Sequence, residues 1–337
     1  MSPNTENQLT GCLISICVPA YNCERYIVET LTCLCNQKYS NIEIIVVNDG
    51  STDRTLEKIE SIKDDRIRII NSENGGAARA RNTAYKFTKG EYIIFFDADD
   101  YVKDDFIYAQ WEKIDQKKDV VVLSSWGRFY GDRLDDFKIV PVPFKEMSFE
   151  EWIKYYWHSG RPMTTPGRAL IPRALIEKQG LWNEDLNLND DLEFFTCLFL
   201  GTRKIIFNTE AIYHYRSGIN GLSTKRSSSA YRSLYNSVES STALVLKRFK
   251  SDVHIKKSCA NLWQSMVYEI YPFEKQMTRS AELEIKLLGG SDLKFHAGGY
   301  TKLLASIVGW KLTKIIKTIT WIDTPGIIKF KPSDASM

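Results

Sequence analysis

The first 126 residues alternate between short apolar runs and longer amphipathic stretches, and this alternation constrains the fold more than any other feature. The apolar runs are rich in β-branched and aromatic residues, which is typical of buried strands. They occupy residues 13–18, 42–47, 66–70, 92–96 and 120–123. Helix-like stretches lie between them at about 24–37, 53–63, 77–88 and 103–117. Such alternation predicts an α/β fold with a mostly parallel sheet covered by helices on both faces.

The rest of the chain changes character twice. A loop-rich stretch with two prolines is expected at about 127–147, followed by a helix near 148–158 and a short strand at 168–171. A further helix is expected from Asp190 to Gly201. After about residue 225 the pattern is helical without strands, with helices predicted near 228–249, 252–270, 279–288 and 303–322. The composition therefore indicates a domain boundary near 225.

Charge and composition exclude several classes of protein. Lys and Arg exceed Asp and Glu by three in 337 residues, so the chain as a whole gives no electrostatic reason to expect a nucleic-acid partner. The N-terminal ten residues are polar, and no run of about 18 apolar residues follows. We therefore expect a cytoplasmic protein. Its seven cysteines lack the spacing of zinc ligands and are expected to be reduced.

Polar segments follow each of the first four predicted strands. In a parallel sheet the carboxyl ends of the strands share one edge, and ligands bind there. The sequence therefore predicts a binding site built from four loops at this edge. These loops are Pro19–Asn22, Asn48–Asp53, Asn71–Gly76 and Asp97–Asp100.

The turn Asp97-Ala98-Asp99-Asp100 has two interpretations. It follows directly on an apolar strand, so a rigid element would hold its carboxylates. Clustered carboxylate oxygens suit Mg²⁺ or Mn²⁺, either of which could bridge them to a diphosphate. The alternative is a cap for the helix at 103–117, because Asp is favoured at helix starts.

The second and third loops are equally open to structural interpretations. Asp49 lies where the base or ribose of a nucleotide would lie, although the surrounding Asn48–Asp53 segment also has the composition of a turn. Gly75 and Gly76 open a helix that carries Arg79 and Arg81, so its N-terminus could approach a phosphate closely. The spacing does not match a P-loop or a dinucleotide-binding fingerprint.

Five segments in this order resemble those of glycosyltransferase family 2, whose members have the GT-A fold. The resemblance covers roughly residues 11–223 and implies a mostly parallel, Rossmann-like sheet. It rests on Val18-Pro-Ala-Tyr-Asn22, Val47-Asn-Asp-Gly-Ser-Thr-Asp53, Gly76-Ala-Ala-Arg-Ala-Arg-Asn82, Gly90-Glu-Tyr-Ile-Ile-Phe-Phe-Asp-Ala-Asp-Asp100 and Asn189-Asp-Asp-Leu-Glu-Phe194.

The resemblance implies a donor-binding set on the first loops. Pro19 and Tyr21 would lie against the nucleotide base, and Asp49 would hydrogen-bond it. Arg79 and Arg81 would serve the donor as well. Arg216, in the segment Tyr213-His214-Tyr215-Arg216, could pair with the diphosphate, although an anchoring role for this arginine is equally compatible with the sequence.

The same resemblance implies the metal ligands and the catalytic base. Asp99 would be the principal ligand of Mn²⁺ or Mg²⁺, with Asp97 nearer the ribose and Asp100 assisting. Relatives often carry a histidine where this chain has Gly218, so the third metal ligand stays open. Asp191 would remove the proton of the acceptor hydroxyl. The competing interpretation is a capping box, in which Asn189 or Asp190 caps the helix together with Glu193.

The resemblance implies an inverting hexosyl- or related glycosyltransferase that uses a nucleotide sugar, with UDP the expected nucleotide. Its acceptor would be a glycan or lipid-linked saccharide in surface-polysaccharide synthesis at the cell envelope. Residues 11–225 would form the catalytic domain, with a donor half to about 126 and an acceptor half from about 127. Residues 1–10 would be a disordered tail and 226–337 a helical C-terminal region.

Three alternatives stay open from the sequence. A sugar nucleotidyltransferase should carry a basic, glycine-rich loop after its first strand, and this chain has Pro19–Asn22 there. A catalytically inactive nucleotide-sugar-binding homologue would be expected to lack some of the acids that are present here. The lysine-rich helix at 303–322 could contact the inner face of the plasma membrane or pack on the catalytic domain.

Overall fold

The computed structural model describes residues 11–162, 164–219 and 226–321. The expected disordered tail at residues 1–10 lies outside the described residues, as does most of the loop after Gly218. The chain forms two compact units. The first consists of residues 1–153 and 163–250, and the second consists of residues 154–162 and 251–337.

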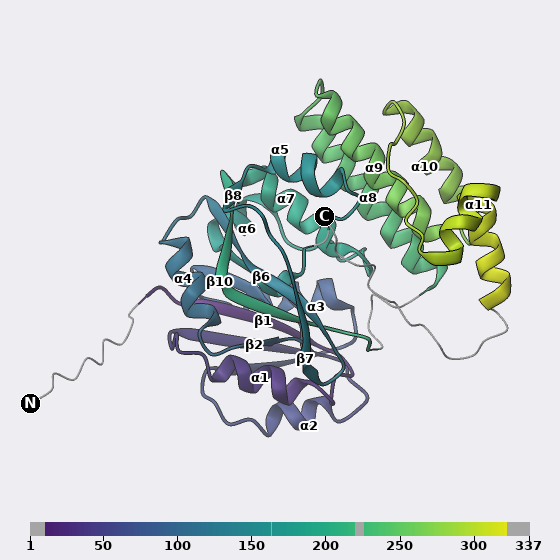
Figure 1. Ribbon diagram of the computed structural model, residues 1–337. Coiled ribbons are helices and arrows are strands. Elements are labelled where there is room, and N and C mark those ends of the chain that lie inside the picture. The colour runs from purple at the N-terminus through teal and green to yellow at the C-terminus, as the bar shows by residue number, and fades with distance from the viewer. Residues whose placement is uncertain (1–10, 163, 220–225, 322–337) are drawn as a thin grey trace, which may run out of the picture. The chain divides into compact units, whose positions relative to one another are not determined.

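A ten-stranded sheet forms the centre of the first unit (Figure 1). Its main path has the order β3-β2-β1-β4-β9-β6-β10-β5, with β7 paired to β6 and β8 paired to β10. The pairs β3-β2, β2-β1, β1-β4 and β6-β10 are parallel, whereas β9 and β5 run antiparallel to the strands beside them. The strands on this path are β1 (Ile14–Ala20), β2 (Ile42–Asp49), β3 (Ile67–Ser72), β4 (Tyr92–Phe95), β5 (Tyr101–Val102), β6 (Val120–Tyr130), β9 (Ala169–Pro172) and β10 (Lys204–Ser217).

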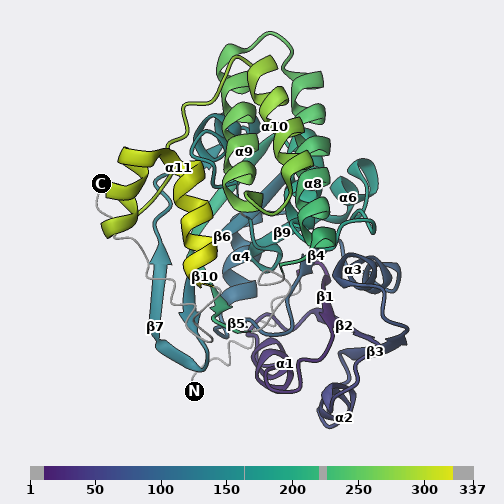
Figure 2. The same ribbon diagram turned by 90° about the vertical axis from the view of Figure 1, so that its right-hand side faces the viewer.

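Helices cover both faces of this sheet, as the alternation of the sequence predicts. Ile14, Ile16 and Val18 of β1 pack into a core shared with α1 and α4. Helix α3 lies on the other side of β1 and β2 (Figure 2). The covering helices are α1 (Ile27–Cys35), α2 (Thr55–Glu60), α3 (Ala77–Lys86), α4 (Phe106–Ile114), α6 (Arg173–Gln179) and α7 (Asp190–Gly201).

The prediction of a loop at about 127–147 is wrong for most of that segment. β6 continues to Tyr130, β7 (Arg133–Val140) pairs with it in antiparallel register, and β8 (Glu146–Met147) pairs with β10. The sequence of β7 is rich in charged residues because much of this strand is exposed. A polar strand at the edge of a sheet lacks the apolar alternation by which strands are recognised.

Shorter elements follow β8 along the chain. The expected helix near 148–158 is α5 (Phe149–Trp152), continued by a π-helical turn at Ile153–Trp157. A 3₁₀ turn at Pro166–Arg168 precedes β9. Helix α8 (Ser228–Arg248) packs on α7 and belongs to the first unit, beyond the composition change near 225. The backbone N–H groups of Asn187 and Leu188 donate to Ser233 Oγ of α8, which fastens this helix to the segment before α7.

The second unit is helical. It contains α9 (Val253–Ile270), α10 (Lys275–Leu287) and α11 (Gly299–Trp321). Gly309, with a φ of 78°, interrupts α11 and divides the helix expected at 303–322 into two pieces. Trp310 packs edge-on against Tyr268 and Tyr271, which holds α11 to α9. Over the described parts of the chain, no helix combines the length and apolarity needed to cross a membrane.

Candidate active site

The acidic turn after β4 divides its side chains between the two faces of the sheet. Phe96 and Ala98 point into the core shared with α1 and α4, whereas Asp97 and Asp99 are only half-buried. Thr30 Oγ1 of α1 donates to the carbonyl oxygens of Ala98 and Asp100, at 3.1 and 2.9 Å. These bonds hold the backbone of the turn, so the carboxylates of Asp97 and Asp99 project from a rigid support.

Asp100 does not share the environment of its two neighbours. Its side chain is fully buried, accepts a hydrogen bond from the Tyr213 hydroxyl, and accepts another from the Arg216 backbone N–H at 2.6 Å. Burial, with Asp99 and Asp97 nearby, holds the pKa of Asp100 well above its ordinary value. Each of its oxygens thus accepts a hydrogen bond inside the protein, and the expectation that Asp100 assists in metal binding stays a prediction.

Helix α7 brings two further acids to the same region. The helix begins at Asp190, and its N-cap residue Asn189 has the left-handed backbone conformation, with a φ of 60°. The Asn189 side chain makes no capping bond and instead donates to Ser237 Oγ at 2.7 Å. The capping box considered for Asn189 and Glu193 is therefore absent, and the acids at 190 and 191 are left without that structural explanation.

Arg81 connects the two acidic segments. Its Nη2 lies 2.8 Å from Asp97 Oδ1, and its Nη1 lies 2.8 Å from Asp190 Oδ2. The Arg81 side chain is 7% exposed and lies over the ring of Trp182, 4.4 Å from its centre. The guanidinium is thus paired on two sides inside the protein, and the expected donor contact of Arg81 stays a prediction.

The acids left at this edge have perturbed proton affinities. Burial raises the pKa of Asp191 to about 7, and the adjacent Asp190 adds to the rise while Arg81 opposes it. Burial and the neighbouring Asp97 likewise raise the pKa of Asp99 to about 7. Asp191 accepts one hydrogen bond, from the Leu192 backbone N–H to Oδ1 at 3.0 Å. A carboxylate that gains a proton near neutral pH is suited to general-base chemistry.

Asp49 is buried and tied to the start of α3. Its two carboxylate oxygens accept from the backbone N–H groups of Gly75 and Gly76, each at 2.9 Å. The second interpretation of this region, a structural turn, is therefore well supported, and contact of Asp49 with a nucleotide base stays a prediction. Gly76 has a φ of 88°, a conformation that favours glycine.

Three of the expected donor residues are accessible. Tyr21 follows β1 directly and is 48% exposed. Pro19 is half-buried near the end of the same strand, and Arg79 is exposed on α3. The opening of the site toward solvent therefore runs along the ends of β1 and α3.

Arg216 serves the opposite side of the acidic turn. Its side chain is fully buried, forms ion pairs with Glu29 of α1 and with Asp132, and donates from Nε to the Asp99 carbonyl oxygen at 2.6 Å. The rings of Tyr26 and Phe129 lie 4.6 and 4.5 Å from its guanidinium carbon. These contacts support the anchoring role, and the diphosphate contact of Arg216 stays a prediction.

His214 also points away from the acids. It packs between the rings of Tyr101 and Phe137, and burial lowers its pKa to about 4. Across the described residues, no three histidine, cysteine, aspartate or glutamate side chains gather as a metal-binding group. The seven cysteines are all unpaired, as expected from their spacing.

The contacts that support Arg81 were not predicted from the sequence. Asn82 accepts from the Trp182 backbone N–H at 3.0 Å and donates from Nδ2 to the Trp182 carbonyl oxygen at 2.8 Å. Trp182 stacks on Phe194 of α7 with ring centres 4.0 Å apart, and Phe194 packs edge-on against Phe95 of β4. These contacts join α3, α7 and β4 over a hundred residues of chain, and an alternating pattern of apolar residues does not encode them.

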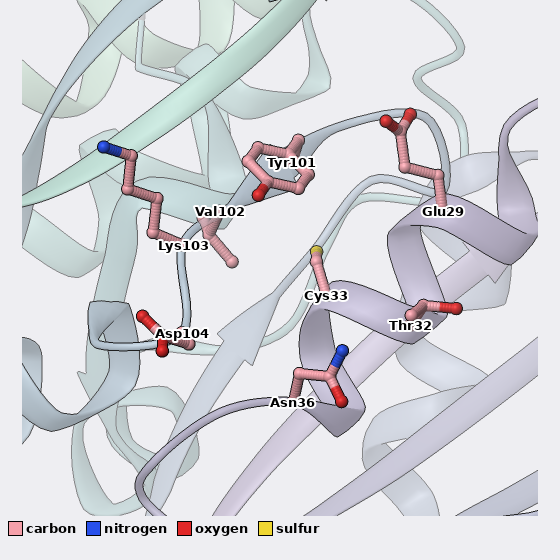
Figure 3. A pocket seen from close by; sticks show the side chains of 8 residues that line it. All are labelled: Glu29, Thr32, Cys33, Asn36, Tyr101, Val102, Lys103 and Asp104. Carbon is pink, nitrogen blue, oxygen red and sulfur yellow. The ribbon is translucent and has the colours of Figure 1, made fainter.

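A pocket of about 700 Å³ lies elsewhere on the first unit, between α1 and the segment after the acidic turn. Figure 3 shows Glu29 and Thr32 of α1, and Asn36 directly after it, on one side of the pocket, with Tyr101 and Lys103 on the other. Glu29, the partner of Arg216, is part of its lining, but Asp97, Asp99 and Asp191 are not. This pocket is therefore distinct from the acidic edge of the sheet.

Comparison with known proteins agrees with this arrangement. A sequence profile described as "Glycosyl transferase family 2" matches residues 15–180. Glycosyltransferase GlyG of Streptococcus pneumoniae is 33% identical over 220 residues, which are 60% of this chain and 70% of that protein. The UDP-Glc:alpha-D-GlcNAc-diphosphoundecaprenol beta-1,3-glucosyltransferase WfaP of Escherichia coli is 40% identical over 146 residues, covering 42% of this chain and 56% of WfaP.

A solved structure has the same fold. The crystal structure of Staphylococcus aureus TarS 1-349 in complex with UDP-GlcNAc superposes with a TM-score of 0.66 over 82% of this chain and 81% of that one. The two sequences are 22% identical, so this likeness speaks for the fold, which is of the GT-A type. Together with the match to GlyG and the family profile, it leads to one conclusion: the chain belongs to glycosyltransferase family 2.

Proposed function

We propose that the protein transfers a sugar from a UDP-sugar to a hydroxyl group of a glycan or lipid-linked saccharide, with inversion, in the synthesis of a surface polysaccharide. The observation that carries this proposal is the meeting of the Asp97–Asp99 turn with Asp190 and Asp191 around Arg81. The choice of UDP is supported by WfaP, named for a UDP-Glc donor, and by TarS, crystallised with UDP-GlcNAc.

Asp191 is the proposed base. The acceptor oxygen forms a bond to the anomeric carbon while the bond from that carbon to the diphosphate oxygen breaks, and the diphosphate leaves with the electron pair. The acceptor hydroxyl gives its proton to Asp191, because a neutral hydroxyl is a poor nucleophile. Displacement by attack from the face opposite the leaving group inverts the anomeric centre. A pKa near 7 matches this role, since the carboxylate is ionised at neutral pH and can still take up the proton.

Asp99 and Asp97 are the proposed ligands of Mn²⁺ or Mg²⁺. They offer hard oxygen atoms at a site where burial already disfavours the anionic form of Asp99, so a cation there would relieve that cost. Two carboxylates without a third protein ligand suit these ions, which commonly complete their shell with substrate phosphates and water. The bound ion would supply charge stabilisation for the departing diphosphate. Asp100 is left out of this set because its oxygens are occupied.

Tyr21 and Pro19 are proposed to contact the base of the nucleotide, and Arg79 to meet the diphosphate from the start of α3. Both Tyr21 and Arg79 are exposed beside the ends of their elements. Asp49 would reach the base from a carboxylate that already holds Gly75 and Gly76.

We also propose that helix α11 makes peripheral contact with the inner face of the plasma membrane. Leu303, Ile307, Leu312 and Ile319 of this helix are exposed. Residues 293–321 contain five lysines and no acid. Exposed apolar side chains beside lysines favour a surface of anionic lipid. Sedimentation with phosphatidylglycerol vesicles, but not with phosphatidylcholine vesicles, is the expected result, and the substitution Ile307→Ser should weaken it.

The deciding experiment is a panel of nucleotide-sugar donors with Mn²⁺ or Mg²⁺, in which release of the nucleoside diphosphate is measured. The intact chain should turn over a UDP-sugar, and Asp191→Asn should lose transfer to an acceptor by about 100- to 10,000-fold. Asp185→Asn is the matched control, because Asp185 is an exposed acid in the segment before α7. If the intact chain binds a donor but turns over none, it is the inactive nucleotide-sugar-binding homologue. If it neither binds nor turns over any donor, the proposed function is wrong.

A further inference from the structure

Arg81 contacts both acidic segments of the site. Its partners Asp97 and Asp190 lie 16 and 109 residues away in the chain. The exposed fractions of the three side chains are 7%, 22% and 17%, so the pairs are shielded from most of the solvent. Ion pairs of this kind depend strongly on geometry, since a buried charge that loses its partner is costly.

The guanidinium group is suited to hold two carboxylates at a fixed separation. Its nitrogen atoms lie in one plane and donate in set directions, whereas the ammonium group of lysine is a single point of charge. Here each terminal nitrogen has its own carboxylate, at the same distance of 2.8 Å. The spacing between Asp97 and Asp190 is therefore defined by the width of one side chain.

The helix that carries Arg81 is itself held at its N-terminus and next to Arg81. Asp49 holds the N-terminus of α3 through Gly75 and Gly76, and Asn82 holds the next turn to Trp182. Trp182 also covers one face of the Arg81 guanidinium. Because the helix is held in place, a movement of the Arg81 guanidinium toward one carboxylate lengthens its contact with the other.

We propose that Arg81 is a positioning residue that couples the donor side of the site to the acceptor side through its shared guanidinium. A change in charge at Asp190, beside the proposed base, alters how firmly Arg81 holds Asp97, and hence how well Asp97 serves the donor. The reverse follows, because a coupling between two binding sites is reciprocal. This inference rests on the proposed function for the identity of the two sides.

A double-mutant cycle tests the coupling by a binding measurement. The affinity for Mn²⁺ in the presence of saturating UDP is measured by titration calorimetry for the intact chain, Asp190→Asn, Arg81→Gln and the double variant. Asp190→Asn leaves the guanidinium to Asp97 alone, so the affinity should fall by about three- to tenfold. In the Arg81→Gln background the same substitution should change the affinity by less than about twofold.

Arg173 provides the matched control background. It is a partly buried arginine that lies over the ring of Tyr85 and donates to Gly90 O and Thr88 Oγ1, with no contact to Asp97 or Asp190. Arg173→Lys should leave the effect of Asp190→Asn unchanged. Arg81→Lys replaces Arg81→Gln if that variant does not fold, because it keeps the charge and removes the planar fork.

Equal effects of Asp190→Asn with and without Arg81 would overturn the coupling, as would the absence of any effect in the intact background. If the intact chain binds no UDP, the proposed function fails on that result alone. The coupling is then judged from urea unfolding of Asp97→Asn, Asp190→Asn and their combination. Non-additive free energies of unfolding support it, and strict additivity overturns it.

Discussion

Two buried arginines, Arg81 and Arg216, lie on opposite sides of one acidic turn and make different contacts. On the side of α3 and α7, Arg81 joins Asp97 to Asp190, and the carboxylates there stay within reach of solvent. On the side of α1 and β10, Arg216 is fully buried and holds Glu29, Asp132 and the backbone of Asp99. The comparison teaches that four consecutive residues can contribute to chemistry on one face of a sheet and to stability on the other.

The most direct test of the difference between the two sides is to remove one acid from each. Asp99→Asn should lower donor turnover by about 100- to 1,000-fold, because a proposed metal ligand that stabilises the leaving diphosphate is lost. Asp100→Asn keeps an oxygen for the Arg216 N–H and should change turnover by less than about fivefold. Steady-state release of UDP measures both. A larger loss for Asp100→Asn than for Asp99→Asn would reverse the assignment of the two sides.

The anchoring role of Arg216 predicts an effect on stability. Arg216→Gln removes the buried partner of Glu29 and Asp132 and the contacts with Tyr26 and Phe129, so the free energy of unfolding should fall by about 2–4 kcal/mol. Urea unfolding gives this value. The more exposed pair Arg203–Asp119 is the control, and Arg203→Gln should leave the free energy of unfolding nearly unchanged. Equal costs would mean that Arg216 is no anchor.

The acid on the α7 side should also control the dependence of the reaction on pH. Asp191 must be ionised to act as a base, and its pKa is raised to about 7, so transfer should fall about tenfold between pH 8 and pH 6. The native state also binds more protons than the unfolded state between the ordinary aspartate pKa and about 7, so this group makes the protein less stable as pH rises through that range. A rate that stays flat down to pH 5 would remove Asp191 from the base role.

The smallest expected effect concerns Asp49, which holds the start of α3 and is proposed to contact the nucleotide base. Asp49→Asn keeps the size of the side chain and loses one of the two acceptors for Gly75 and Gly76, so the free energy of unfolding should fall by about 1 kcal/mol. If Asp49 also binds the base, the same substitution should in addition lower the affinity for UDP by about tenfold. Calorimetry with UDP separates the outcomes, and an unchanged affinity would leave Asp49 with the helix cap alone.

Much of the fold follows from the sequence because its signals are local. The apolar runs that become β1, β2, β3 and β4, and the helices that follow them, are set by periodicities within single segments. The polar loops are then expected to meet at one edge of the sheet, because the carboxyl ends of parallel strands share that edge. β7 was not predicted because it is a polar edge strand without an apolar alternation, and its pairing with β6 stabilises it.

By itself, the sequence determined that an acidic turn follows a buried strand and that two further acids open a helix near Asp190. Only the tertiary structure decided which of those oxygens stay available. The Asp100 carboxylate accepts hydrogen bonds from Tyr213 and Arg216. Asp97 pairs with Arg81, which also pairs with Asp190, 109 residues farther along the chain. Such pairings depend on the packing of distant elements, because a charged side chain in the interior must find its partner wherever the fold places one.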